Sequence, residues 1–106
     1  MATPRLCLET DIIIDYLRRY NDVLERVLID FDCALAAVTV YELGIGLARA
    51  PRKKILFEDL INIVIVLPLD YAAAKIAARV YNDLRVQGQL IGVQDMLIAG
   101  ICIAYD

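Results

Sequence analysis

Three acidic residues stand far apart in this chain, each in a short apolar context. Glu9 begins the run E-T-D-I-I-I-D, Glu42 lies within V-T-V-Y-E-L, and Asp95 lies within G-V-Q-D-M-L-I-A-G. A carboxylate is costly to bury alone and must be paired, hydrogen-bonded or bound to a metal. If the fold brings the three together, their mutual repulsion requires a cation. The pattern therefore suggests hydrolysis that depends on a metal ion.

The residue types that are absent narrow the chemistry further. The chain has no His, no Ser and no Trp. Ser–His and Cys–His nucleophile pairs are thus excluded, as are zinc sites built on imidazole. The three cysteines cannot form a four-cysteine site, and we expect them to be buried, inert thiols outside any disulfide framework. Clustered carboxylates that hold Mg²⁺ or Mn²⁺ fit the remaining inventory best, because hard cations prefer oxygen ligands.

The elements that would position these acids alternate along the chain. Hydrophobic periodicity predicts strands at 5–8, 34–38 and 63–68, and helices at 11–20, 22–29, 39–50, 52–61, 70–86 and 94–104. Strands that alternate with helices indicate a parallel sheet, whose sites form beyond the carboxyl ends of the strands. Glu9 and Glu42 fall at or just after such ends, whereas Asp95 opens the last helix with no strand before it. A helix dipole would stabilise each carboxylate near a first turn.

Composition limits the size, compartment and partners of the protein. A chain of 106 residues predicts a single domain, residues 1–106, and its 60% apolar content suggests a surface that a partner covers. No apolar run of about 18 residues and no signal-peptide region is present, which predicts a cytoplasmic protein without membrane contact. Net charge is −3, but Arg49, Arg52, Lys53 and Lys54 form a basic cluster. This cluster either contacts phosphates or is simply a solvated helix end.

The segments 8–17, 39–46 and 92–100 resemble the PIN domain family, and within it the VapC toxins of toxin–antitoxin pairs. The resemblance implies an α/β/α sandwich with a short central parallel sheet. It also implies a ribonuclease that cleaves phosphodiester bonds of RNA with Mg²⁺ or Mn²⁺. The metal ligands and catalytic residues would be Glu9, Glu42 and Asp95. The family further implies a homodimer and a VapB-like antitoxin as partners.

Two departures from the family pattern affect these expectations. Glu9 stands where Asp is usual, so its longer side chain shifts the carboxylate, and Asp11 becomes a further candidate ligand. Family members also continue beyond the last helix into another strand and a turn with a fourth polar position. Because this chain stops at Asp106, we expect a C-terminally incomplete PIN-like domain that lacks this strand. The strand at 5–8 would then be an exposed edge, which a homodimer could help to cover.

Simpler explanations exist for each acid. Thr39 and Glu42 fit a T-x-x-E capping box, in which Glu42 would only cap a helix. Asp95 could merely complement a helix dipole, and Asp11 could be a helix cap. The alternative function is a catalytically weak or inactive PIN module that acts by binding RNA or protein.

Overall fold

The computed structural model describes residues 5–89 and 91–105. The first four residues, where we expect no signal peptide, lie outside the described part. Asp106 lies outside the described part as well.

The centre of the fold is a parallel three-stranded sheet in the order β1-β2-β3. The strands are β1 (Arg5–Cys7), β2 (Asp32–Ala36) and β3 (Ile65–Leu67). Leu6 pairs with Cys33 on one side of β2, and Leu35 pairs with Val66 on the other. The predicted α/β class with a short central parallel sheet is therefore confirmed. Among the described residues β1 is an edge strand, as expected, and Leu6 is exposed.

Six helices connect and follow the strands in the described residues. They are α1 (Thr10–Leu17), α2 (Val23–Asp30), α3 (Ala37–Leu47), α4 (Pro51–Ile61), α5 (Tyr71–Val86) and α6 (Val93–Ala104). Every predicted element is present and in the predicted order. Pro51 occupies the first position of α4, where its missing N–H would have had no helical partner. The described helices contain no segment that is both long and apolar enough to cross a bilayer.

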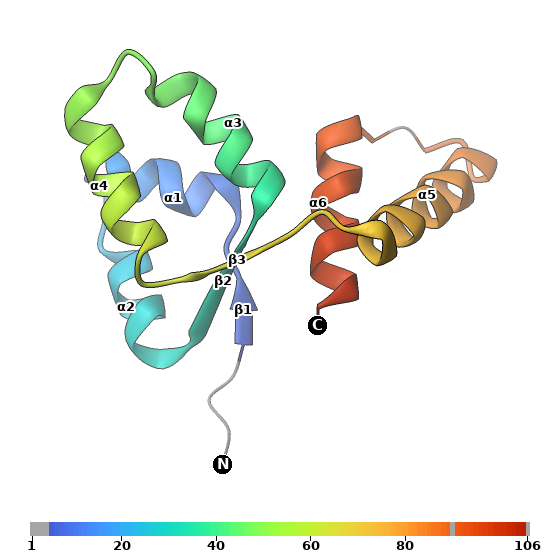
Figure 1. Ribbon diagram of the computed structural model, residues 1–106, viewed down its shortest axis with the longest axis horizontal. Helices are drawn as coiled ribbons and strands as arrows, with labels where there is room; N and C mark the ends of the chain where they lie inside the picture. The colour runs from blue at the N-terminus through green and yellow to red at the C-terminus, as the bar shows by residue number, and fades with distance from the viewer. Residues whose placement is uncertain (1–4, 90, 106) are drawn as a thin grey trace.

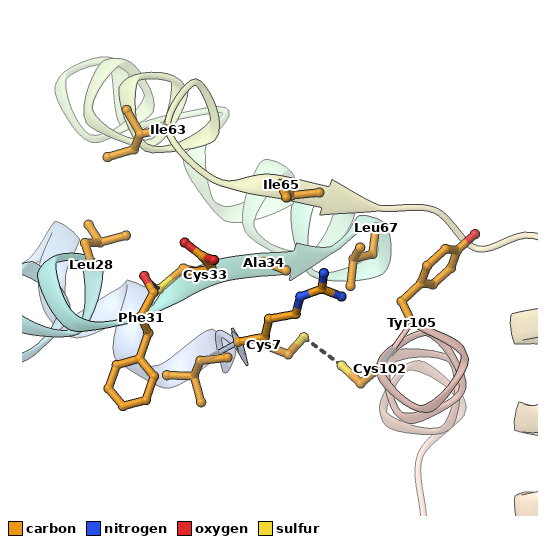
Figure 2. A pocket seen from close by; sticks show the side chains of 13 residues that line it. Cys7, Leu28, Phe31, Cys33, Ala34, Ile63, Ile65, Leu67, Cys102 and Tyr105 are labelled. Atoms are coloured by element: carbon orange, nitrogen blue, oxygen red, sulfur yellow. Dashed lines mark hydrogen bonds between the residues drawn. The ribbon is translucent and has the colours of Figure 1, made fainter. Parts of the chain in front are cut away.

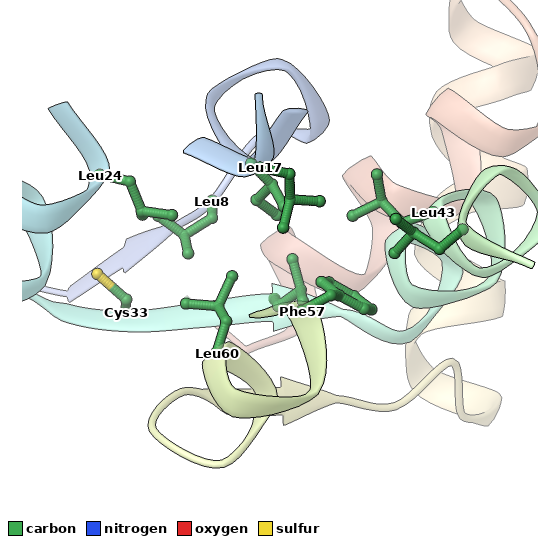
Figure 3. Packing of buried hydrophobic residues seen from close by; sticks show 10 residues of the cluster. Leu8, Leu17, Leu24, Cys33, Leu43, Phe57 and Leu60 are labelled. Atoms are coloured by element: carbon green, nitrogen blue, oxygen red, sulfur yellow. The ribbon is translucent and has the colours of Figure 1, made fainter. Parts of the chain in front are cut away.

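The sheet separates two hydrophobic clusters, because successive strand residues point to opposite faces. On one face, side chains of β2 pack against α1, α2 and α4 (Figure 3). The buried residues of this larger cluster are Leu8, Ile13, Leu17, Leu24, Cys33, Leu35, Leu43, Leu47, Phe57 and Leu60. The smaller cluster joins Ala36 and Val38 to α5 and α6 through Ala73 and Ile101. The result is the predicted α/β/α arrangement, with α5 and α6 standing beside the sheet (Figure 1).

The α5–α6 pair is joined closely at two places. Gly100 of α6 faces α5 so tightly that a Cβ there would lie 2.5 Å from the Ala73 carbonyl oxygen. Asp70 caps α5, as predicted, by accepting a 3.0 Å hydrogen bond from the Ala73 N–H. The hydroxyl of Tyr105 donates to the other Asp70 oxygen, which lowers the pKa of that carboxyl. These contacts fix the position of α6, and therefore of Asp95 at its start.

The cysteines only partly follow the expectation of buried, inert thiols. Cys33 is buried, and burial raises the pKa of its thiol, with the Asp32 carboxylate adding to the rise. Cys7 and Cys102 are only half-buried, and their sulfur atoms lie 2.7 Å apart. The predicted burial is wrong for this pair, and their contact across 95 positions of sequence leaves no local signal.

Candidate active site

Glu9 stands at the junction of β1 and α1. The N–H of Leu8 still bonds to the Ala34 carbonyl at 2.8 Å, so the strand pairing runs up to the residue before Glu9. Glu9 itself is the N-cap of α1 with an extended backbone, but its side chain makes no capping hydrogen bond. Asp11 lies in the first turn of the same helix. The explanation of Asp11 as a cap is wrong, because the N-cap position belongs to Glu9.

Glu42 lies further into a helix than the sequence suggested. The helix α3 begins at Ala37, directly after β2, with Ala36 as its N-cap and without a side-chain capping bond. Thr39 is therefore the third helical residue rather than a cap, and the predicted capping box does not form. The boundary was misplaced because the T-x-x-E pattern is a local signal, whereas pairing of β2 with β3 extends through Ala36. Since Glu42 lies beyond the first turn, the helix dipole gives it little support.

One oxygen of Glu42 has no hydrogen-bond partner although it is buried. The atom is Oε1, and it is the one such buried side-chain oxygen or nitrogen that the described residues contain. Leaving a charged buried acceptor without a partner costs more than the roughly 1–3 kcal/mol of a neutral one. A bound cation would remove this cost, because it would supply the missing electrostatic partner.

Asp95 is placed by the start of α6. It lies in the first turn of that helix, which follows a loop rather than a strand, as predicted. Its side chain stays close to the helix N-terminus, since a Cβ built on Gly92 would lie 3.9 Å from Asp95 Oδ2. The residue is exposed.

All four candidate acids line a single pocket of about 570 Å³. The lining comprises Cys7, Leu8, Glu9, Thr10, Asp11, Thr39, Glu42, Asp95, Ile98 and Cys102. We call this the acidic pocket. It lies beyond the carboxyl ends of β1 and β2, where a parallel sheet places its sites. The sequence therefore identified the acids that share a pocket, although they are up to 86 positions apart.

The sequence did not identify two hydroxyl residues of the same pocket, Thr10 and Thr39. Thr39 is almost fully buried, at 1% exposure. It lies three residues before Glu42, a spacing that places both side chains on the same face of α3. This spacing was visible in the sequence but was interpreted as a capping pattern.

The donor set of the acidic pocket fits a hard divalent cation. The polar side chains that line it offer only carboxylate and hydroxyl oxygens, apart from the two thiols, and Glu42 Oε1 lacks a partner. Within residues 5–89 and 91–105, no three acidic or thiol side chains already surround a common metal position. Binding would thus require side-chain rotation, and the roles of Glu9, Glu42, Asp95 and Asp11 as ligands stay a prediction.

A second, smaller pocket of about 270 Å³ shares Thr10 and Glu42 with the acidic pocket. It is lined by Thr10, Ile14, Leu17, Arg18, Glu42, Leu43, Gly46, Leu47, Ala50 and Lys53, which belong to α1, α3 and the start of α4. We call it the α1–α3 groove. Most of its lining is apolar, and Arg18 and Lys53 supply its two positive charges. One residue of the predicted basic cluster, Lys53, therefore lies beside a path to the acids.

Comparison with known proteins places these features in context. The sequence matches the PIN domain family over residues 6–106. It is 30% identical over 94 residues to Ribonuclease VapC3 of Methanocaldococcus jannaschii, which covers 89% of this chain and 94% of that protein.

Solved structures of toxin–antitoxin complexes have the same fold. The chain matches DNA-bound VapBC from Salmonella typhimurium with a TM-score of 0.85 and 22% identity, covering 98% of this chain and 82% of that one. For VapBC2 of Rickettsia felis, bound to a promoter DNA fragment, the TM-score is 0.83 at 18% identity, with 95% and 82% covered. For FitAcB of Neisseria gonorrhoeae these values are 0.73 and 26%, with 93% and 81% covered.

Proposed function

Because this chain belongs to the PIN domain family, we propose that it is a VapC-type ribonuclease that depends on a divalent metal ion. The observation that carries the proposal is the acidic pocket. It gathers Glu9, Glu42 and Asp95 at the carboxyl end of the sheet and leaves Glu42 Oε1 buried without a partner. The name of the Methanocaldococcus jannaschii relative supports RNA as the substrate.

The acids would hold the ion from three different elements. Glu9 at the α1 N-cap, Glu42 in α3 and Asp95 at the start of α6 would supply carboxylate oxygens, and Asp11 would be a further ligand. When bound, Mg²⁺ or Mn²⁺ would polarise the scissile phosphodiester and lower the pKa of the attacking water. Glu9 is exposed and makes no capping bond, so its extra methylene can be accommodated by side-chain rotation.

The α1–α3 groove gives the RNA a positively charged approach. Lys53 and Arg18 line this groove, and Glu42 belongs to both the groove and the acidic pocket. Contacts of this kind hold the phosphate backbone without selecting a sequence. The carboxylates would otherwise repel RNA, so the cations on the approach offset part of that repulsion.

We further propose partners that follow from the structural relatives. The VapBC complexes contain a toxin and its antitoxin, which supports a VapB-like antitoxin as the inhibitor of this chain. The apolar residues and the two cations that line the α1–α3 groove suit an amphipathic segment that carries acidic residues. Exposed apolar residues and the β1 edge support a homodimer, and the composition supports a cytoplasmic location.

Cleavage of a labelled random pool of single-stranded RNA tests the proposal. We expect cleavage with Mg²⁺ or Mn²⁺ and none with excess EDTA. Asp95→Asn should abolish cleavage, because the side chain keeps its size but loses its charge. The matched control is Asp83→Asn, at an exposed position of α5 outside the acidic pocket, which should cleave like the wild type.

Two results would contradict the metal mechanism: equal cleavage in EDTA, or full activity of the Asp95→Asn protein. If the wild type binds the RNA pool but never cleaves it with any metal, the binding-module alternative is favoured instead.

A further inference from the structure

Two thiols from opposite ends of the chain meet beside the acidic pocket. Cys7 ends β1 and Cys102 lies in the last turn of α6, and their Sγ atoms are 2.7 Å apart (Figure 2). A disulfide joins its sulfur atoms at about 2.05 Å. The two sulfur atoms therefore need to approach by roughly 0.65 Å to form a bond.

Reagents in solution can reach this thiol pair. Both cysteines are half-buried, and besides the acidic pocket both line a cavity of about 440 Å³, bounded also by Ile65, Leu67 and Tyr105 (Figure 2). The third cysteine, Cys33, also lines this cavity but is more deeply buried. Cys33 is buried at 8% exposure and points toward the carbonyls of Val27 and Phe31.

We propose that Cys7 and Cys102 form a reversible disulfide when the protein meets an oxidant of the small-molecule disulfide class, such as oxidised glutathione. One cysteine loses its proton and its sulfur attacks the small disulfide, whose S–S bond breaks and releases one small thiol. The second cysteine then loses its proton and attacks the protein sulfur of the mixed disulfide, releasing the other small thiol. Two electrons and two protons thus pass from the pair to the oxidant, and a reducing thiol reverses the exchange.

The bond would connect the strand that leads to Glu9 with the helix that carries Asp95. Cys7 lies two residues before Glu9, and Cys102 lies seven residues, about two helical turns, after Asp95. Since β1 is an edge strand with a neighbouring strand on one side only among the described residues, a covalent link to α6 would add a second attachment. The link also closes a loop of nearly the whole chain, which is the case in which a cross-link most restricts the unfolded state. The oxidised protein should therefore be the more stable form.

Mapping the thiols of the full chain tests the proposal without reference to activity. The protein is incubated with excess oxidised glutathione, denatured, and treated with N-ethylmaleimide, with the fully reduced protein as reference. We expect labelling of only Cys33 after oxidation and of all three cysteines after reduction. Trypsin should release one linked species that joins peptides 6–18 and 86–106. The melting temperature should rise by about 10 °C on oxidation and return with dithiothreitol.

Single variants separate this pair from an unspecific reaction. Cys7→Ser and Cys102→Ser should each lose the linked species and the rise in melting temperature, whereas Cys33→Ala should keep both. A link that involves Cys33, a disulfide between two chains, or full labelling after oxidation would each overturn the proposal. Peptide mapping of the wild type decides the question even if a variant fails to fold.

Discussion

Substitution of Gly100 by alanine tests whether close packing of α5 and α6 positions the acidic pocket. The new Cβ would lie 2.5 Å from the Ala73 carbonyl oxygen, 2.7 Å from the Ala77 Cβ and 2.9 Å from the Ala77 nitrogen. Two of these three atoms belong to the backbone, so no change of side-chain rotamer relieves the contact. Carbon and carbonyl oxygen normally approach to about 3.3 Å, so the helices would have to separate by roughly 0.8 Å.

The expected cost combines two opposing terms. Overpacking of a well-packed contact costs about 1–3 kcal/mol, and the rigid backbone on the α5 side places this case toward the upper end. Replacing glycine by alanine inside a helix returns about 1 kcal/mol. The net destabilisation should be about 1–2 kcal/mol, which corresponds to a fall in melting temperature of roughly 5–15 °C for a domain of this size.

Thermal unfolding followed by circular dichroism measures this change, with Gly44→Ala as the matched control. Gly44 is also inside a helix, α3, but a Cβ there would meet nothing within 4 Å. The control should therefore gain up to about 1 kcal/mol from helix propensity alone. The two glycine-to-alanine changes are thus expected to shift the melting temperature in opposite directions. If Gly100→Ala were as stable as the wild type, the α5–α6 contact would not be as tight as described. The reasoning that this contact positions Asp95 would then be refuted.

Three further predictions follow from the pocket, the groove and the end of α6. Glu9→Asp should keep metal-dependent cleavage of RNA, because a carboxylate is retained, whereas Glu9→Gln should lose it; equal rates for both variants would exclude Glu9 as a ligand. Lys53→Ala should weaken RNA binding and reduce the slope of log affinity against log salt by about 1 in fluorescence anisotropy titrations. Lys75→Ala, on the exposed side of α5, should change neither, and equal effects of the two variants would refute the groove as the path of the RNA. In the Asp70–Tyr105 hydrogen bond, the Tyr105 hydroxyl lowers the pKa of the Asp70 carboxyl most, and the Ala73 N–H lowers it further. The ionised carboxyl therefore stabilises the fold fully above the usual pKa of 3.8, and this contribution is lost as the pH falls below that value. The same bond raises the pKa of Tyr105, so the stability of the fold falls as the pH rises above about 10. The melting temperature of Tyr105→Phe should therefore vary less than that of the wild type at both extremes of pH. A variant with the same dependence of melting temperature on pH as the wild type would show that the bond is not formed.

The sequence predicted the order and type of the elements because each strand–helix unit carries strong local signals. β1 and α1, for example, combine a short apolar run with a polar residue at the turn, and Asp70 caps α5 where expected. The start of α3 was wrong because Thr39 and Glu42 have the spacing of a capping box while the preceding strand pairs up to Ala36. Local patterns cannot register how far a ladder extends, since this depends on the partner strand.

The candidate site was predictable in its acids but not in their surroundings. Glu9, Glu42 and Asp95 could be identified because carboxylates at the ends of apolar runs have few structural explanations. The unpartnered oxygen of Glu42 and the meeting of Cys7 with Cys102 arise only when α6 packs against the sheet. Both depend on tertiary contacts between segments that are remote in sequence, so no periodicity or spacing could have indicated them.

The most direct test of the proposed metal-dependent function is a crystal structure of the protein soaked in Mn²⁺, with anomalous diffraction measured to locate the ion. We predict an anomalous peak inside the acidic pocket, with oxygens of Glu42 and Asp95 bound to the ion either directly, at about 2 Å, or through a bridging water. The peak should disappear in crystals of Asp95→Asn grown and soaked in the same way. An acidic pocket that stays free of anomalous density at saturating Mn²⁺, or a manganese ion bound only elsewhere on the protein, would contradict the proposal.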